Sequence, residues 1–138
     1  IADGSLHRLE ATLAITALPP VKPHVVCAQI HDANDDLMMI RLEGKKLFVE
    51  RNKVGDVLLD PDYELGTRFD LKIEASDGHV RVFFNGQQKM DWEKSKNRCY
   101  FKAGCYTQSN TAKGDLPTAY GEVVINKLKV EHLARSNK

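Results

Sequence analysis

The stretch FDLKIEASDGHVRVFFNGQQKMDW, residues 69–92, decides the fold class. Its first segment, 69–75, carries apolar side chains at every second position, the pattern of a β-strand with one face on a core. Asp77-Gly78 and Asn85-Gly86 then separate three such segments. Both dipeptides tolerate the positive φ angles of a tight type I′ turn. The stretch therefore predicts three consecutive antiparallel strands joined by two hairpins.

The same alternation continues outside this stretch, and no long segment keeps a helical period. The expected strands cover residues 7–15, 25–32, 37–42, 46–51, 69–75, 79–84, 87–92, 100–108 and 121–133. Nine strands without intervening helices predict an all-β fold, an antiparallel two-sheet β-sandwich of jelly-roll type. A length of 138 residues suits one domain with one core, so 1–138 is expected to be a single domain.

Composition excludes several classes of protein. The chain is 42% hydrophobic and 28% charged, which is the balance of a globular domain rather than a disordered one. No apolar run approaches the ~20 residues of a membrane span. The net charge of +1 argues against a nucleic-acid binder, and a polyanionic ligand would need a local basic cleft.

The three cysteines, Cys27, Cys99 and Cys105, leave two alternatives open. None forms a Cys-x-x-Cys pair, so zinc-ribbon and thioredoxin-like folds are unsupported. On a straight strand Cys99 and Cys105 would lie roughly 20 Å apart, too far to bond. A bend near Gly104 would instead allow a Cys99–Cys105 disulfide and leave Cys27 as a free buried thiol.

Two expected strands have a polar face of unusual chemistry. Gln29 and His31 share one side of segment 25–32, because residues two apart face the same way, while Ala28 and Ile30 face the core. Spacing of this kind is also typical of an ordinary solvated face. By itself it indicates no more than a β-sandwich that can bind carbohydrate.

The second such strand is segment 100–108. One side carries Lys102, Gly104, Tyr106 and Gln108, so a cation, a phenol and an amide project together. The other side carries Phe101, Ala103, Cys105 and Thr107. Gly104 has no side chain, and we expect it to leave a gap where a ligand can approach the backbone.

The sequences of these two strands are more specific than their spacing. Gln29-Ile30-His31 and YFKAGCYTQ (100–108) resemble two of the three signature motifs of polysaccharide lyase family 7, the alginate lyases. Similarity in family order also covers 22–32, 40–50, 65–75 and 120–132, so the resemblance spans essentially the whole chain.

The resemblance implies a jelly roll whose concave sheet forms the substrate cleft, and it implies site residues by position. His31 matches the general base of the family, and Tyr106 matches its catalytic acid, which for some substrates is also the base. Gln29 matches the residue that binds the uronate carboxylate. Lys102 and Gln108 match cleft-lining positions near the bond that is cleaved. No metal or organic cofactor is implied.

The implied activity is endo cleavage of alginate or a related 4-linked uronate polysaccharide by β-elimination. The hydrogen on C5 is a very weak acid, so donors that neutralise the adjacent carboxylate stabilise the developing enolate-like charge. A neutral histidine is available near pH 7 as the base, and a phenol can protonate the leaving oxygen. Ile30 in the first motif favours guluronate or mixed blocks. We expect a secreted or periplasmic monomer with no nucleic-acid or membrane partner.

One signature motif of the family is absent. Its arginine-rich motif, Arg-(Ser/Thr)-Glu-(Leu/Val)-Arg, has no match upstream of Gln29, and Arg8-Leu9-Glu10 resembles it only superficially. We therefore expect this chain to be the C-terminal larger part of the domain. Arg41, with Lys45, is the candidate to replace the missing arginine in substrate binding. A non-catalytic acidic-polysaccharide-binding sandwich is the alternative, and a purely structural β-domain is a third.

Overall fold

The computed structural model describes residues 6–32, 36–51, 53–94, 99–107 and 120–133. These residues form ten strands and no helix, so none of them lies in a helix long and apolar enough to cross a membrane. The strands are β1 (Leu6–Ala17), β2 (His24–His31), β3 (Asp36–Glu43), β4 (Lys46–Arg51), β5 (Gly55–Asp60), β6 (Arg68–Ser76), β7 (His79–Phe84), β8 (Gln87–Glu93), β9 (Tyr100–Thr107) and β10 (Glu122–Leu133).

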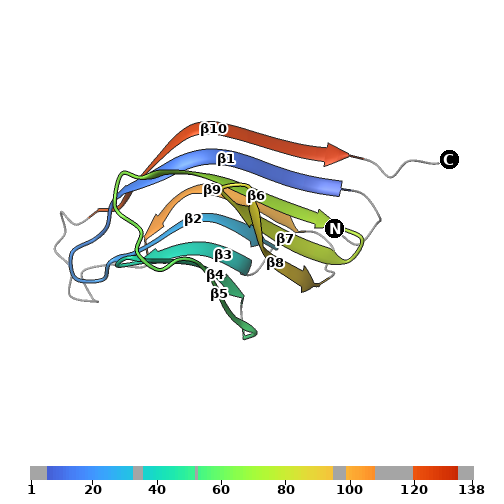
Figure 1. The fold of residues 1–138 in the computed structure, drawn as a ribbon, viewed down its shortest axis with the longest axis horizontal. Helices are drawn as coiled ribbons and strands as arrows, with labels where there is room; N and C mark the ends of the chain where they lie inside the picture. Colours follow the sequence, from blue (N-terminus) through green and yellow to red (C-terminus); the bar gives the residue numbers. More distant parts are fainter. Residues whose placement is uncertain (1–5, 33–35, 52, 95–98, 108–119, 134–138) are drawn as a thin grey trace.

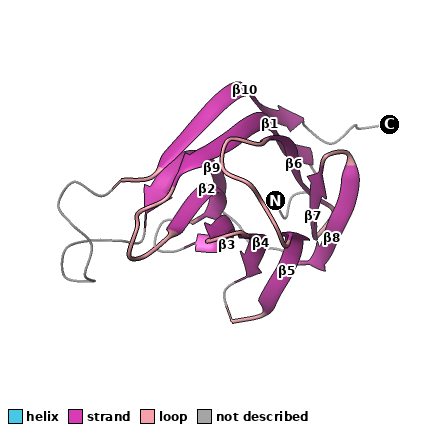
Figure 2. Cartoon of the chain, turned by 60° about the vertical axis from the view of Figure 1, so that its left-hand side comes forward, coloured by secondary structure: helices cyan, strands magenta, loops and turns pink. Residues whose placement is uncertain are grey.

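The strands form two five-stranded sheets that pack face to face (Figures 1 and 2). The β1 sheet has the order β10-β1-β6-β7-β8, and the β2 sheet has the order β5-β4-β3-β2-β9. All strand pairs are antiparallel. The prediction of an all-β, two-sheet antiparallel sandwich is confirmed.

The two predicted hairpins join β6 to β7 and β7 to β8. Asp77 and Gly78 have φ angles of 51° and 76°, and Asn85 and Gly86 have φ angles of 50° and 83°. Positive φ at both central residues is what a type I′ turn requires, and it matches the twist of the paired strands. These turns fix the register of the three strands.

Strand β5 was not predicted. Its sequence, GDVLLD, begins with glycine and aspartate and is followed by Pro61, which are residues typical of turns. It lies at the edge of the β2 sheet, where only Leu59 is buried. An edge strand needs few inward side chains, so its alternation is weak and the predicted number of strands was one too low.

The core lies between the sheets and takes alternate side chains from each strand. On β6 the inward residues are Phe69, Leu71, Ile73 and Ala75, all of them buried as their spacing predicts. The same core receives the inward residues of β2, β3 and β4 from the opposite sheet. This shared core positions the outward residues of both sheets.

All three cysteines are unbonded, so the alternative with a Cys99–Cys105 disulfide is wrong. Strand β9 stays extended from residue 100 to 107 and holds the two cysteines apart. Cys27 is fully buried, and this burial raises the pKa of its thiol to about 12. A thiol that stays protonated near neutral pH is a poor nucleophile, so Cys27 acts as an apolar core residue.

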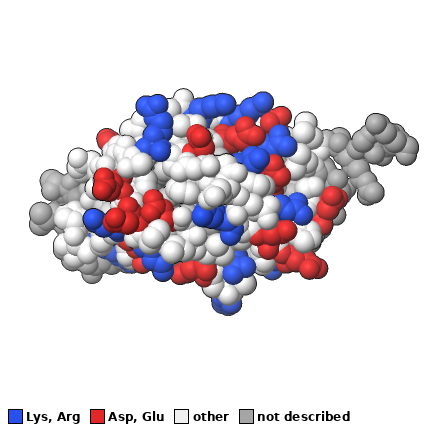
Figure 3. Space-filling model, viewed as in Figure 1, with Lys and Arg blue, Asp and Glu red and all other residues white. Residues whose placement is uncertain are grey.

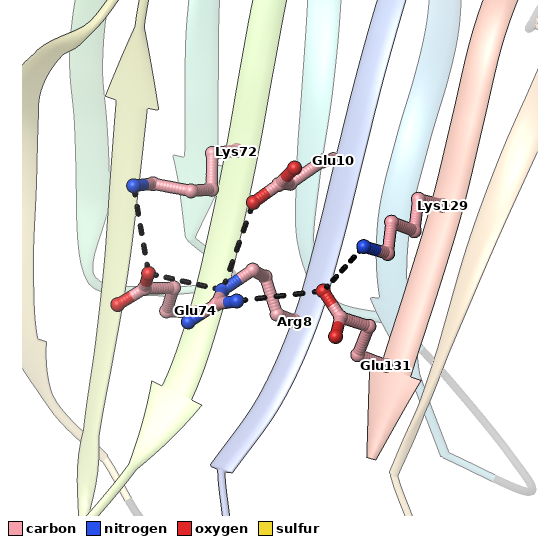
Figure 4. A network of polar contacts seen from close by, with 6 residues as sticks. All are labelled: Arg8, Glu10, Lys72, Glu74, Lys129 and Glu131. Carbon is pink, nitrogen blue, oxygen red and sulfur yellow. Dashed lines mark hydrogen bonds and ion pairs between the residues drawn. The ribbon is translucent and has the colours of Figure 1, made fainter. Parts of the chain in front are cut away.

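The outer face of the β1 sheet carries a network of ion pairs (Figure 4). Arg8 on β1 lies 3.3 Å from Glu74 on β6 and 3.4 Å from Glu131 on β10, its partners in the pairing register. Lys72 lies 3.6 Å from Glu74, and Lys129 lies 3.5 Å from Glu131, so both lysines belong to the network. Basic and acidic groups are interspersed over the side of the molecule drawn in Figure 3. Through Arg8, the network joins edge strand β10 to its neighbour β1 and to β6 beyond it.

A buried phenol ties β1 to the loop that precedes β6. Tyr63 is 2% exposed, and its hydroxyl accepts a 2.9 Å hydrogen bond from the Ile15 N–H and donates a 2.5 Å bond to the Thr67 carbonyl. Burial raises the pKa of the Tyr63 phenol, so the donated hydrogen is retained at neutral pH. Its ring meets Phe69 edge to face at 5.6 Å.

Tyr63→Phe keeps the ring and removes the hydroxyl, so the Ile15 N–H and the Thr67 carbonyl lose their partner. We expect the free energy of unfolding to fall by about 1–3 kcal/mol, the cost of leaving buried polar groups unsatisfied. Urea denaturation followed by circular dichroism measures it. Tyr120→Phe, at a residue that is 64% exposed, is the matched control. Equal unfolding free energies for the two variants would contradict the assigned role of the hydroxyl.

Candidate active site

Strand β2 presents Gln29 and His31 on the outer face of the β2 sheet. Their neighbours Ala28 and Ile30 are fully buried in the core. Gln29 is 8% exposed although it faces outward, and His31 is half-buried. These four residues therefore have the predicted orientation in the structure.

A β-bulge at Cys27 determines which face of the sheet each side chain of β2 occupies. In the register with β3, the pairing passes from Val26–Arg41 directly to Ala28–Ile40, so Cys27 is the additional residue. Cys27 and Ala28 both belong to the core cluster, and the alternation is interrupted there. The bulge places Val26 on the same face as Gln29 and His31.

Strand β9 supplies the other half of this face. In the register with β2, Tyr100 lies opposite His31, Lys102 opposite Gln29, and Tyr106 opposite Val26. Side chains directly opposite each other on an antiparallel pair share a face, with Cβ atoms about 4.5–5.5 Å apart. Along the two strands, the Gln29–Lys102 pair therefore lies between His31 on one side and Tyr106 on the other.

The Lys102 ammonium lies between the two tyrosines of β9. Its Nζ is 5.8 Å from the ring centroid of Tyr100 and 5.9 Å from that of Tyr106. Both distances are within the range in which a cation is attracted to an aromatic face. These contacts hold the positive charge over the middle of the face, beside Gln29.

Gly104 makes room for the Tyr106 side chain. A Cβ atom at position 104 would lie 3.4 Å from the Tyr106 hydroxyl oxygen, so the phenol sits over the glycine backbone. The gap that the sequence predicted at Gly104 is occupied by Tyr106, and a ligand does not find open space there. The absent side chain lets Tyr106 lie back along its own strand toward Lys102.

The hydrogen bonds of His31 define its tautomer. Nδ1 lies 2.5 Å from the carbonyl oxygen of Asp32, and a carbonyl only accepts, so Nδ1 carries the hydrogen. In the neutral ring, Nε2 then holds the free lone pair. The Tyr100 hydroxyl is 3.5 Å from Nδ1, and the two ring centroids are 5.8 Å apart. His31 is thus held with its basic nitrogen away from the backbone.

This geometry predicts the Nδ1–H tautomer for neutral His31. We expect two-bond ¹⁵N–¹H correlation spectra of the neutral ring to show a protonated Nδ1 and an unprotonated Nε2. His79, whose Nδ1 is 2.7 Å from the Asp91 carboxylate, provides an internal comparison in the same spectrum. A neutral His31 protonated on Nε2 would contradict the Asp32 hydrogen bond.

Arg41 reaches the same face from β3, opposite Val26. Its guanidinium is paired with two carboxylates: Nη1 lies 2.5 Å from Glu50, and Nη2 contacts Glu43. Its central carbon also lies 5.6 Å from the ring centroid of Phe48. The predicted substrate-binding arginine is therefore on the expected face, with both terminal nitrogens already engaged by carboxylates of the protein, while its buried Nε has no hydrogen-bond partner among the described residues.

A hollow of about 350 Å³ lies beside Arg41. Its lining residues are Arg41, Glu43, Phe48, Glu50, Arg51, Lys53, Gly55 and Asp56. The lining mixes three cations with three carboxylates, and the carboxylates disfavour a polyanion until their charges are offset. Lys45, the other suggested substitute, pairs with Asp62 at 3.5 Å on exposed side chains.

The sequence did not predict two members of the site, Tyr100 and Glu50. Tyr100 shares the spacing of Lys102 and Tyr106, so the alternation of β9 contained the signal for it. Glu50 gave no signal, because its role depends on a contact across strands. Gln108 lies outside the described residues. Among the described residues, no group of three or more histidine, cysteine or acidic side chains is placed to hold a metal ion.

Comparison with protein families shows one match. Residues 2–132 match the model of a family described as alginate lyase. Comparison with curated proteins found no match.

Solved structures agree with the family match. The alginate lyase AlgAT5 from polysaccharide lyase family 7 is 54% identical with a TM-score of 0.92, over 94% of this chain and 60% of the other. An alginate lyase from Corynebacterium sp. is 38% identical with a TM-score of 0.89, over 95% and 60%. The marine lyase AlyA1 from Zobellia galactanivorans is 25% identical with a TM-score of 0.81, over 95% and 63%. This chain thus spans about three fifths of the length of these lyases.

Proposed function

Because this chain belongs to the alginate lyase family, we propose that it contributes the catalytic face of an enzyme that cleaves 4-linked uronate polysaccharide by β-elimination. The observation that carries the proposal is the order of groups on β2 and β9. An amide and an ammonium, Gln29 and Lys102, lie opposite each other, with His31 on one side and Tyr106 on the other.

This order fits the charge that develops during elimination. Removing the C5 hydrogen places negative charge on the neighbouring carboxylate, and donors fixed at that point stabilise it. Gln29 donates from its amide, and Lys102 supplies a positive charge held by Tyr100 and Tyr106. The carboxylate clamp is thus between the two groups that move protons.

His31 and Tyr106 complete the reaction. The free Nε2 lone pair of His31 takes the C5 proton, and the electrons of that bond form the C4–C5 double bond as the C4–O4 bond breaks. The Tyr106 hydroxyl gives its proton to the leaving O4. Afterwards His31 releases the proton it took from C5 to solvent, and the Tyr106 phenolate takes up a proton from solvent. The products are an unsaturated uronate at one new end and a free hydroxyl at the other.

Removing either proton-transfer group tests these roles. We expect His31→Ala and Tyr106→Phe each to lower kcat about 10²–10⁴-fold, the usual contribution of a positioned acid or base. The rise in ultraviolet absorbance of unsaturated uronate during incubation with polyguluronate and polymannuronate measures it. His79→Ala, at a half-buried residue of β7, and Tyr120→Phe, at an exposed residue that precedes β10, both outside β2 and β9, are the controls.

Two outcomes would count against the proposal. Near-normal activity of either variant would refute the assigned role of that residue. Binding of both polymers without any rise in absorbance would favour the alternative of a non-catalytic acidic-polysaccharide-binding sandwich.

We further propose an endo-acting enzyme with a preference for guluronate or mixed blocks, secreted or periplasmic where the polymer is found. Ile30 motivates the preference through the resemblance of its motif. Ile30 is fully buried in the core, so its influence on substrate choice acts through the positions of Gln29 and His31.

Arg41 is proposed as a weaker contributor to substrate binding. A uronate carboxylate has to compete with Glu50 and Glu43 for the guanidinium, and one carboxylate replaces another with little net gain. Its pairing therefore limits the affinity that this arginine can add to the cleft.

Glu50→Gln tests this competition. We expect KM for polyguluronate to fall about two- to fivefold with kcat unchanged, because a neutral amide releases Arg41 for the substrate. Glu74→Gln, an ion-paired glutamate on the outer face of the other sheet, is the control. A lower melting temperature with an unchanged KM would instead assign the Arg41–Glu50 pair a purely structural role.

A further inference from the structure

Two cysteines occupy the same step of neighbouring strands. Cys27 lies on β2 and Cys105 on β9, and these strands are paired antiparallel (Figures 1 and 2). The cross-strand pairs on either side of the two cysteines are Val26–Tyr106 and Ala28–Ala103. Between these pairs β2 has one residue, Cys27, and β9 has two, Gly104 and Cys105. The irregularity in the register therefore brings Cys27 opposite Gly104 and Cys105.

Both thiol side chains point to the inner face of the β2 sheet. Cys27 is fully buried in the core cluster. Cys105 is two residues from Ala103, which packs against the core, so alternation places both on the inner face of β9. A Cβ atom at Gly121 would lie 2.6 Å from a methyl carbon of the buried Val25 and 3.4 Å from the Cys105 Sγ, so both side chains border the same glycine. The two thiols are thus cross-strand neighbours on one face.

The spacing of the strands suits a covalent bond between these thiols. Facing residues of an antiparallel pair have Cα atoms about 4.5–5.5 Å apart. A disulfide spans roughly 4.4–6.8 Å between Cα atoms. Burial, with a smaller contribution from the negative charge of a Cys105 thiolate, raises the pKa of the Cys27 thiol to about 12. Repulsion between charges weakens with distance, so this contribution reflects the proximity of the two sulfur atoms.

We propose that Cys27 and Cys105 are a redox-active pair that forms a reversible disulfide between β2 and β9. The bond ties together the two strands that carry the catalytic face. Cys105 directly precedes Tyr106, so the bond anchors β9 beside the proposed catalytic acid. The oxidising compartment implied by the proposed secreted or periplasmic location favours such a bond.

A small disulfide such as oxidised glutathione supplies the oxidising equivalents. The thiolate of the exposed Cys105 attacks one sulfur of oxidised glutathione, which forms a mixed disulfide and releases one glutathione. Cys27 then loses its proton and attacks the Cys105 sulfur, which forms the protein disulfide and releases the second glutathione. Two protein thiols are oxidised by two electrons, one glutathione disulfide is reduced, and the two thiol protons end on the released glutathiones.

Proximity explains how a buried thiol takes part in the second step. With Cys105 reduced, Cys27 stays protonated near neutral pH and is an inert core residue. A mixed disulfide on Cys105 places an electrophilic sulfur on the facing strand. An intramolecular attack of this kind has a high effective concentration, which offsets the small fraction of thiolate.

Cys99 is the competing partner for Cys105. It immediately precedes β9, and β9 stays extended from Tyr100 to Thr107. Six residues of extended strand span roughly 20 Å, which is beyond the reach of a disulfide. The fold therefore selects Cys27 rather than Cys99.

The test uses the full 138-residue chain, reduced and then incubated with oxidised glutathione in the folded state. Remaining thiols are blocked with iodoacetamide, and mass spectrometry of the intact chain and of its peptides identifies the product. We expect the mass before blocking to fall by about 2 Da, the loss of two hydrogens. We expect one cross-linked peptide pair, joining Cys27 to Cys105, and a blocked Cys99. Dithiothreitol should restore all three thiols.

Three variants give the test its controls. Cys99→Ser should form the same bond at an unchanged rate. Cys27→Ala should stop at the mixed disulfide on Cys105, and Cys105→Ser, at an exposed position, should leave Cys27 reduced. We expect oxidation to raise the melting temperature of the unmodified sequence by at least about 5 °C, as closing a long loop does. Cys27→Ala should lack this shift, and circular dichroism establishes that each variant is folded.

Other outcomes overturn the proposal. They are a disulfide that includes Cys99, a stable mixed disulfide on Cys105 beside a reduced Cys27, three thiols that stay reduced, and a Cys27–Cys105 bond that forms only in urea. None of these readouts depends on lyase activity. A chain without activity that forms the bond would refute the proposed function alone, and an active chain that does not form it would refute the redox pair alone.

Discussion

Two sheets that share one core have to place every second side chain between them, and this period of two governs the rest of the molecule. On β2 it buries Ala28 and Ile30 and leaves Gln29 and His31 outside. The register with β9 then places Lys102 opposite Gln29, and no additional contact is needed to bring the two residues together. The polar face follows from strand pairing once the apolar residues are buried.

The parts of the structure that obey this period could be predicted from the sequence. Alternation located nine of the ten strands, and Asp-Gly and Asn-Gly located two hairpins, because these dipeptides adopt the required positive φ. The run VVCAQIH on β2 was different. Its apolar residues are consecutive, so the bulge at Cys27 that puts Val26 on the outer face leaves no trace in the spacing.

The contacts within the candidate site were the least predictable, because they depend on atoms from separate strands. The pairing of Arg41 with Glu50 requires β3 and β4 to lie in one register, and it changes the meaning of the arginine from a free donor to an engaged one. Gly104 was read as open space, but the neighbouring Tyr106 fills that space. The residue types of the face were evident in the sequence, whereas their mutual orientation was not.

Strand β9 belongs to the core and to the site at once. Its outer face carries Tyr100, Lys102 and Tyr106, while Phe101 and Ala103 on its inner face pack against the core. Packing of the inner face orients the strand, and the register with β2 then places Tyr100 and Lys102 opposite His31 and Gln29. The polar face and this part of the core are therefore consequences of the same strand.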